Sequence, residues 1–260
     1  GPGEYHRHRY AASLSSTASL LYIYIIVGMN IKKHIPNMLT AGNLLSGVMA
    51  IVFTLYAGRP DVAMWLIVLS AVFDFFDGMV ARLLGVSSPI GKDLDSLADV
   101  VSFGLAPATL VFRGLEGLDA GNYLNYGVFV VVAFAALRLA KFNNDTRQST
   151  SFLGLPVPSN ALFWIGAAAA IPSFGLSIGA SATLITYLVL TLVLSLLMVS
   201  ELPMFSFKLS KEPLSHKWPQ LVLIVVAIGS VVWLGWFGCS VTIIAYLLLS
   251  LLPQQKGEKA

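Results

Sequence analysis

Long apolar runs dominate the chain from Pro36 onward, separated by short segments rich in polar residues, glycine or proline. A bilayer core about 30 Å thick needs roughly 20 apolar residues per helical span. Backbone polar groups in lipid are satisfied only within helices or closed barrels, and the sequence shows no strand-like alternation. The pattern therefore predicts an all-α polytopic membrane bundle of about eight transmembrane helices, a six-helix core followed by a C-terminal hairpin. The expected spans are Pro36–Ala57, Asp61–Leu84, Pro89–Phe112, Tyr123–Ala140, Val157–Phe174, Ile178–Val199, Trp218–Phe237 and Cys239–Leu252.

Composition supports a membrane protein with a single domain over residues 29–260. Hydrophobic residues make up 57% of the 260 residues, charged residues 11%, and the mean hydropathy is +0.79. Soluble domains carry about 25% charged residues. Residues 1–28 begin with polar sequence, and their apolar run Leu20–Val27 is too short to span a bilayer. We expect this segment to be an added, disordered or interfacial one, with Met29 as the native start. Cys239 is the single cysteine, which excludes an intrachain disulfide and a cysteine metal site.

Lysine and arginine sort to one side of the predicted topology, and only Arg59 and Arg113 fall on the other. By the positive-inside rule, both termini and the acidic residues described next face the cytoplasm. The net charge of +3 reflects basic loops beside anionic lipid head groups and does not indicate nucleic-acid binding. The residues on the basic side are Lys32, Lys33, Arg82, Lys92, Arg138, Lys141, Arg147, Lys208, Lys211, Lys217, Lys256 and Lys259.

Aspartates within apolar sequence carry the main indication of function. A carboxylate in a membrane bundle is costly to desolvate unless it pairs, lines a water-filled cavity or holds a cation. Since a helix advances about 100° per residue, Asp74 and Asp77 share one face near the cytoplasmic end of the second span. Gly78, Ala81 and Arg82 lie on the same face. The small residues let a ligand or a helix approach the backbone, and the Arg82 guanidinium can bind a phosphate.

The third span begins with a matching face formed by Gly91, Asp95 and Asp99. Only the short segment Leu84–Ile90 separates the two spans, so we expect antiparallel neighbours that bring four carboxylates together. Such an oxygen-rich cluster suits Mg²⁺, Mn²⁺ or Ca²⁺. Two divalent cations would offset the repulsion and leave positions for phosphate oxygens, which favours diphosphate chemistry. Asp93 falls on a different face and is expected to be solvated or to lie at the helix start, where a carboxylate interacts favourably with the helix dipole.

The acids are also compatible with roles that involve no chemistry. A single membrane aspartate can pair helices or carry a proton. The whole cluster also fits a divalent-cation or proton-coupled transporter, although the glycine, alanine and arginine positions then have no evident purpose. A structural or partner-binding role predicts that neutral replacements of the aspartates are harmless or stabilising.

In type and spacing, the acidic pattern resembles the signature D-x2-D-G-x2-A-R-x8-G-x3-D-x3-D of the CDP-alcohol phosphotransferases. This resemblance implies a membrane enzyme that moves a phosphatidyl-type group from a CDP-linked lipid to an alcohol and releases CMP. The matching residues are Asp74, Asp77, Gly78, Ala81, Arg82, Gly91, Asp95 and Asp99.

The same resemblance implies a role for each residue. Asp74, Asp77 and Asp95 would bind one Mg²⁺ or Mn²⁺, with Ca²⁺ as another occupant. Asp74, Asp95 and Asp99 would bind a second ion, and Asp99 would also be the general base. The residues implied to bind the CDP-linked lipid are Asn37, Thr40, Gly78, Ala81, Arg82, Ser88 and Gly91.

Three further segments are similar to those of prokaryotic phosphatidylserine synthases in this family, which implies serine as the acceptor. Serine is a small zwitterion, so Arg138 and Lys141 can bind its carboxylate while Asn143 offers a neutral hydrogen bond. Ordinary positive-inside loop charges are the alternative for both cations. The three segments are Val101–Ala108, Arg138–Asn143 and Phe152–Asn160.

The resemblance thus implies a phosphatidylserine synthase that uses CDP-diacylglycerol and L-serine in the cytoplasmic membrane of a prokaryote, in contact with membrane lipids and as a homodimer. Phosphatidylglycerophosphate and phosphatidylinositol phosphate synthesis are the alternatives within the family. Their acceptors carry a phosphate, which calls for a denser basic pocket.

Overall fold

The computed structural model describes residues 32, 34–86, 88–118, 123–144, 152–204 and 218–251. The segment 1–28 lies outside the described residues, and so do Arg147, the lysines after Met204 and the C-terminal tail. Six helices in the described part of the chain are long and apolar enough to cross a membrane. They are His34–Leu55, Pro60–Leu84, Pro89–Glu116, Tyr123–Asn144, Val157–Ile178 and Ala180–Val199.

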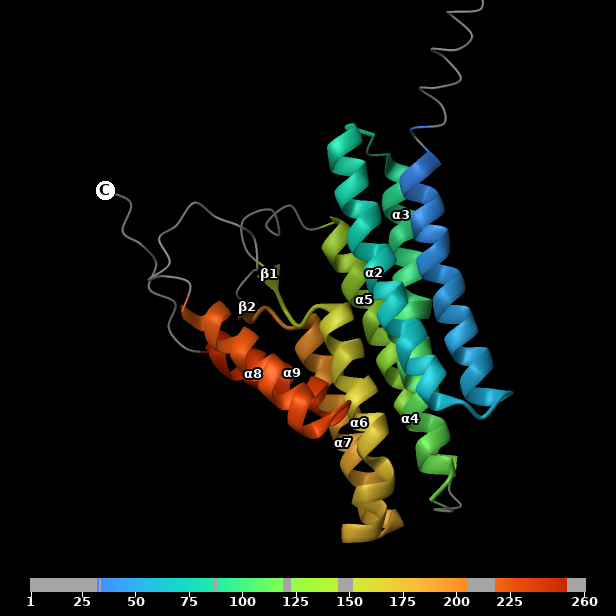
Figure 1. The fold of residues 1–260 in the computed structure, drawn as a ribbon, viewed down its shortest axis with the longest axis vertical. Coiled ribbons are helices and arrows are strands. Elements are labelled where there is room, and N and C mark those ends of the chain that lie inside the picture. Colours follow the sequence, from blue (N-terminus) through green and yellow to red (C-terminus); the bar gives the residue numbers. More distant parts are fainter. Residues whose placement is uncertain are drawn as a thin grey trace, which may run out of the picture.

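The prediction of an all-α membrane bundle is confirmed, and Figure 1 shows the long helices side by side. The first helix is His34–Leu55, and α2 forms the second span. The third span is divided into α3, η1 and α4, and the fourth into η2 and α5. Two shorter apolar helices form the C-terminal hairpin. The bounds are α2 Pro60–Leu84, α3 Pro89–Asp99, η1 Val100–Leu105, α4 Ala106–Glu116, η2 Tyr123–Phe129, α5 Val130–Asn144, α6 Val157–Ile178, α7 Ala180–Val199, α8 Trp218–Leu234 and α9 Phe237–Leu251.

Two local predictions differ from the structure. We expected the sixth span to begin at Ile178, but α6 runs through Ile178 and α7 begins at Ala180. Gly179 between them has φ +84°, a backbone conformation that glycine adopts without steric cost. No strands were expected either, yet β1 (Phe152–Leu153) pairs antiparallel with β2 (Pro203–Met204). Two residues per strand are too few for an alternating pattern to appear.

The third span is the most buried of the six apolar helices in the described chain and forms the centre of the bundle. Its middle segment η1 is a π-helix, in which the Ala106 backbone N–H donates to the carbonyl of Val101. Such a wide turn rotates the residues that follow it and is frequent at functional sites. Here it begins one residue after Asp99, so the helix geometry changes directly beside the predicted acidic cluster.

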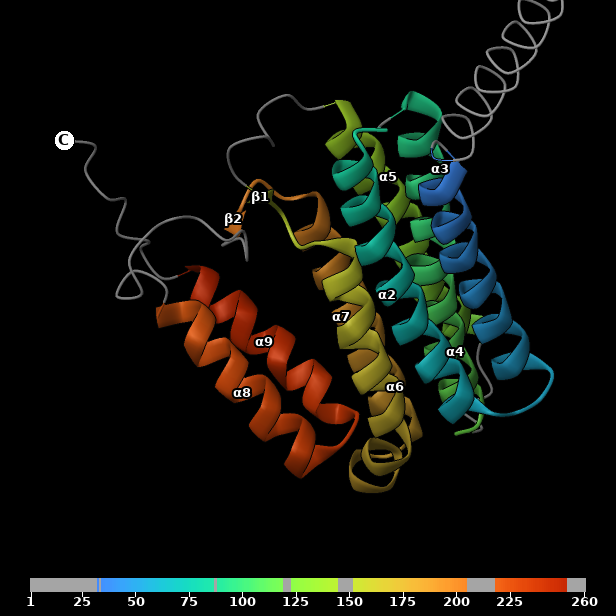
Figure 2. The ribbon, with the colours of Figure 1, turned by 45° about the horizontal axis from the view of Figure 1, so that its top comes forward.

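The hairpin α8–α9 lies beside α6 (Figure 2). Gly166 of α6 permits this contact, because a Cβ there would lie 2.6 Å from the carbonyl oxygen of Trp236 and 2.8 Å from the Ser240 nitrogen. The Ser240 hydroxyl in turn donates to the Phe163 carbonyl at 2.7 Å. Membrane helices pack closely where small residues allow it, since lipid supplies little hydrophobic drive for their association.

We therefore expect Gly166→Val to separate α9 from α6 and to lower the midpoint of thermal unfolding in detergent. Overpacking of this kind costs about 1–3 kcal/mol. Gly229→Ala on α8 is the matched control, because a Cβ there meets no atom within 4 Å. Equal melting midpoints for the two variants would contradict the close contact.

Candidate active site and metal centre

Asp74, Asp95 and Asp99 meet at the cytoplasmic end predicted for the bundle. Each offers one carboxylate oxygen, and the three oxygens lie within 4.8 Å of one another. Asp74 comes from the second half of α2, whereas Asp95 and Asp99 lie one turn apart on α3. Asp99 is buried and the other two are half-buried. Within the described residues, Asp95 Oδ1 is buried without a hydrogen-bond partner. Crowded carboxylates with an open oxygen fit a hard divalent cation.

Asp77 lies on α2 next to this group and faces the first helix. The Thr40 hydroxyl donates to Asp77 Oδ2 at 2.5 Å and lies 3.1 Å from the Pro36 carbonyl oxygen. Asp77 is therefore bound to the first helix and is not one of the three acids whose oxygens converge. Asp77 also lines the neighbouring cavity, together with Asp95. Its second carboxylate oxygen can therefore bind a ligand there.

A cavity of about 560 Å³ opens beside the acids. It is large enough for part of a nucleotide, since ligand pockets measure about 300–1,000 Å³. Arg82, by contrast, is exposed and is not part of the lining. Of the residues that the family resemblance assigns to the CDP-linked lipid, those that line the cavity are Asn37, Thr40, Gly78, Ala81, Ser88 and Gly91.

The wall of the cavity explains why position 91 is a glycine. The Ser88 hydroxyl caps α3 by accepting a hydrogen bond from the Gly91 nitrogen at 3.0 Å. A Cβ on Gly91 would lie 3.0 Å from Ser88 Oγ and 3.2 Å from Asn37 Oδ1. The missing side chain thus lets the start of α3 approach the first helix, and backbone and amide groups form the wall.

Two residues that the sequence analysis did not single out belong to the site. Lys92 lines the cavity and donates from Nζ to the Asn143 carbonyl at 2.9 Å. Asn43 donates from Nδ2 to Asp99 Oδ1 at 3.1 Å. Asn43 follows Thr40 by three residues, so helical periodicity places both on the face that meets the acids. That spacing was a usable signal once Thr40 was a candidate.

The three acceptor candidates on α5 are not brought together. Arg138 is buried, with 7% of its surface exposed, and its charge acts on Asp99 and on Tyr246 of α9. In the described part of the chain its Nε has no hydrogen-bond partner. The Asn143 amide donates to Ser96 Oγ at 2.7 Å. Arg138 is therefore the candidate that lies on the acidic side of α5.

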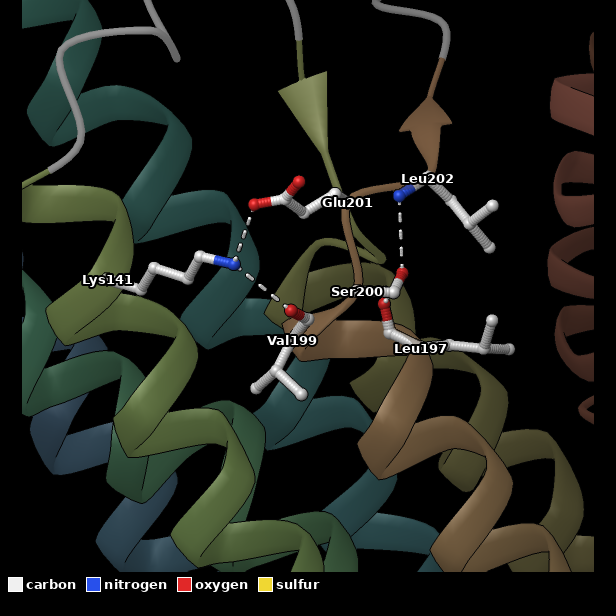
Figure 3. A network of polar contacts seen from close by, with 6 residues as sticks. All are labelled: Lys141, Leu197, Val199, Ser200, Glu201 and Leu202. Atoms are coloured by element: carbon white, nitrogen blue, oxygen red, sulfur yellow. Dashed lines mark hydrogen bonds and ion pairs between the residues drawn. The ribbon is translucent and has the colours of Figure 1, made fainter.

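Lys141 points toward the end of α7 instead (Figure 3). Its Nζ donates to the Val199 carbonyl at 3.3 Å and lies 3.7 Å from Glu201 Oε1. The Ser200 hydroxyl donates to the Leu197 carbonyl at 2.8 Å, which satisfies another carbonyl at this helix end. A cation near a helix C-terminus also interacts favourably with the helix dipole. Lys141 thus has a structural role in joining α5 to α7.

Comparison with known proteins agrees with the geometry. Residues 33–251 match the family model for CDP-alcohol phosphatidyltransferase, and the chain belongs to this family. A CDP-diacylglycerol–serine O-phosphatidyltransferase of Helicobacter pylori strain J99 is 40% identical over 129 residues, 49% of this chain and 54% of the relative. The alignment thus spans about half the length of that relative.

Longer alignments join two other relatives to this chain. A CDP-diacylglycerol–serine O-phosphatidyltransferase of Methanocaldococcus jannaschii is 33% identical over 168 residues, 65% of this chain and 72% of the relative. The protein of the same name from Mycobacterium tuberculosis strain H37Rv is 31% identical over 230 residues, 85% of this chain and 77% of the relative. Both alignments span more than two thirds of the relative.

We expect Mn²⁺ or Mg²⁺ to raise the thermal unfolding midpoint of the wild-type protein in detergent. A ligand at 100 times its dissociation constant stabilises by about 2.7 kcal/mol. Asp95→Asn should abolish this metal-induced shift, since it removes a charge from the three-carboxylate group. Asp93→Asn is the matched control, because Asp93 is exposed and outside the group. A full metal-induced shift in Asp95→Asn would argue against this metal centre.

Proposed function

We propose that this protein is a metal-dependent phosphatidylserine synthase, which transfers a phosphatidyl group from CDP-diacylglycerol to the hydroxyl of L-serine and releases CMP. The observation that carries the proposal is the convergence of three carboxylates beside a cavity lined by residues of the family signature. The names of the relatives support serine as the acceptor.

The acids would hold two divalent cations, Mg²⁺ or Mn²⁺. Asp74, Asp95 and Asp99 would share one, and Asp77 would join Asp74 and Asp95 around the other. The bound cations would neutralise the diphosphate oxygens and the charge on the departing CMP. The unpartnered Oδ1 of Asp95 supports this assignment, because a buried carboxylate oxygen without a donor is unfavourable unless a cation occupies its neighbourhood.

Asp99 would act as the general base. It would take the proton from the serine hydroxyl, and the serine oxygen would then form a bond to the lipid-side phosphorus while the bond from that phosphorus to the CMP oxygen breaks. The proton stays on Asp99 until it passes to water, and no covalent enzyme intermediate is needed. The depth of Asp99, 6% exposed, supports a role in which the base is shielded from bulk water.

Donor and acceptor would approach from different sides of the acids. The cytidine and diphosphate would occupy the 560 Å³ cavity, where Gly78 and Gly91 admit them close to the backbone. Arg82, exposed at the surface, would contact the nucleotide only at the outer edge of the cavity. Arg138 would bind the serine carboxylate, because it is the α5 candidate that is buried near Asp99 with an unpartnered nitrogen.

We also propose how the protein is oriented in the membrane and how it assembles. The site would face the cytoplasm of a prokaryotic cell, with the acyl chains of the donor against the apolar helix faces and serine arriving from water. Arg59 and Arg113, which pair with Asp61 and Glu116, lie at the opposite end of their spans from the acids. The other basic residues of the described chain lie toward the acidic end, which supports that end as the inner one. The proposed assembly is a homodimer, which the family resemblance supports.

The first test is CMP release by purified protein supplied with CDP-diacylglycerol, L-serine and Mg²⁺ or Mn²⁺. Asp99→Asn should lower kcat by about 10²–10⁴-fold, the usual contribution of a general base. Asp93→Asn should retain activity. CMP release no greater in the wild type than in Asp99→Asn would defeat the proposal. Cation uptake into sealed liposomes without nucleotide would indicate a transporter instead.

A second test concerns the acceptor. Arg138→Met should raise the KM for serine by about 10- to 100-fold, since a hydrogen bond to a charged group contributes about 1.5–3 kcal/mol. The KM for CDP-diacylglycerol should change little. Lys141→Met is the control, because its ammonium group faces Val199 and Glu201. Glycerol 3-phosphate or inositol phosphate outcompeting serine in one assay would assign a different acceptor.

A further inference from the structure

Asn43 of the first helix is buried at the centre of the acidic end, with no exposed surface. Its Nδ2 donates to Asp99 Oδ1 at 3.1 Å, which makes Asn43 the side-chain hydrogen-bond partner of Asp99 in the described part of the chain. Ionised carboxylates accept such bonds strongly, so one N–H restricts how the Asp99 carboxylate can turn. Neither the family signature quoted above nor the predicted lipid-binding set includes Asn43.

The backbone of Asn43 is itself anchored by two hydroxyl groups. Ser102 of η1 donates to the Asn43 carbonyl oxygen at 2.9 Å, and the Ser70 hydroxyl of α2 lies between two acceptors, the Asn43 carbonyl oxygen at 3.0 Å and the Leu66 carbonyl oxygen at 3.1 Å. Gly47, one turn further along the first helix, lets Ser102 approach, because a Cβ there would lie 2.7 Å from the Ser102 Cα. The position of Asn43 is thus fixed by the two spans that carry the acids.

The anchoring serines lie close in sequence to the residues that they help to place. Ser70 precedes Asp74 by one helical turn, and Ser102 belongs to the π-helix that starts directly after Asp99. Side chains in a wide π turn leave the register of an α-helix. Here that register brings the Ser102 hydroxyl to Asn43 while Asp99 accepts the Asn43 amide.

The Asn43–Asp99 pair lies outside the cavity proposed for the donor. Asp77 and Asp95 line that cavity, whereas Asn43 and Asp99 do not. Asp99 instead interacts electrostatically with Arg138, the residue proposed above to bind the acceptor. In addition, among the described residues Asn43 Oδ1 is buried without a partner. A buried unpaired carbonyl oxygen marks a place for a water or a ligand donor.

We propose that Asn43 is a positioning residue for the transfer step: it holds the Asp99 carboxylate toward the acceptor hydroxyl and does not contribute to binding of the CDP-linked donor. This inference rests on the proposed function. A base must lie within hydrogen-bond distance of the proton that it removes, so its side-chain rotation has to be restricted before the alcohol binds.

Steady-state kinetics with both substrates varied test the proposal. Asn43→Ala should lower kcat by about 100-fold, the size of effect that a 1 Å misplacement produces. The KM for CDP-diacylglycerol should stay within about threefold of wild type, because the donor cavity is intact. Asn43→Ser keeps a small polar group for folding but has no N–H that reaches Asp99. It should therefore show the same lowered kcat with a nearly unchanged KM for CDP-diacylglycerol.

Asn125→Ala is the matched control. Asn125 is also a buried asparagine with an unpartnered Oδ1, but it lies in η2, beyond the far end of the third span. We expect it to lower the thermal midpoint about as much as Asn43→Ala while keeping the wild-type kcat.

Wild-type kcat in a folded Asn43→Ala or Asn43→Ser would overturn the role of Asn43 and leave the synthase activity standing. A rise in the KM for CDP-diacylglycerol as large as the fall in kcat would also overturn it. Absence of CMP release by the wild-type protein would be a different failure, that of the proposed function itself.

Discussion

Repulsion between carboxylates in a poorly polarisable surrounding is the constraint on which this structure depends. Two ionised carboxylates 4.8 Å apart repel by about 3.5 kcal/mol at an effective dielectric constant of 20, and Asp74, Asp95 and Asp99 each have two such neighbours. A bundle that keeps three acids ionised this close together needs positive charge and hydrogen-bond donors around them. The surrounding residues supply hydrogen-bond donors, and a bound cation would offset the remaining repulsion between the carboxylates.

The first helix supplies the donors. Thr40 donates to Asp77, and Asn43 donates to Asp99, so consecutive turns of one helix serve acids on two different spans. The Asn43 carbonyl then accepts from Ser70 and Ser102, which joins the same three segments from the backbone side. Polar bonds between membrane helices are worth about 0.6 kcal/mol on average, so their main effect is to define one arrangement.

Much of the architecture followed from sequence because its physical causes are local. Long apolar runs specify helices in lipid whatever their neighbours, and all six long spans appear near their expected positions. The convergence of acids from two spans followed from helical periodicity and a short connection. Gly179 shows the limit of this reasoning: it separates α6 from α7 within continuous apolar sequence, where a hydropathy pattern has no boundary to detect.

The sequence by itself determined the class of fold, the family and the identity of the acids, since these depend on hydropathy, spacing and residue type. The tertiary structure alone decided which candidates share a site. Arg138 and Lys141 lie three positions apart on one helix, yet one is buried near Asp99 and the other joins the end of α7. Asn43 carries no charge, and a single asparagine in an apolar helix does not by itself indicate a functional residue. Its importance arises only when packing places its amide against Asp99, because a contact between residues 56 positions apart is a property of the assembled bundle.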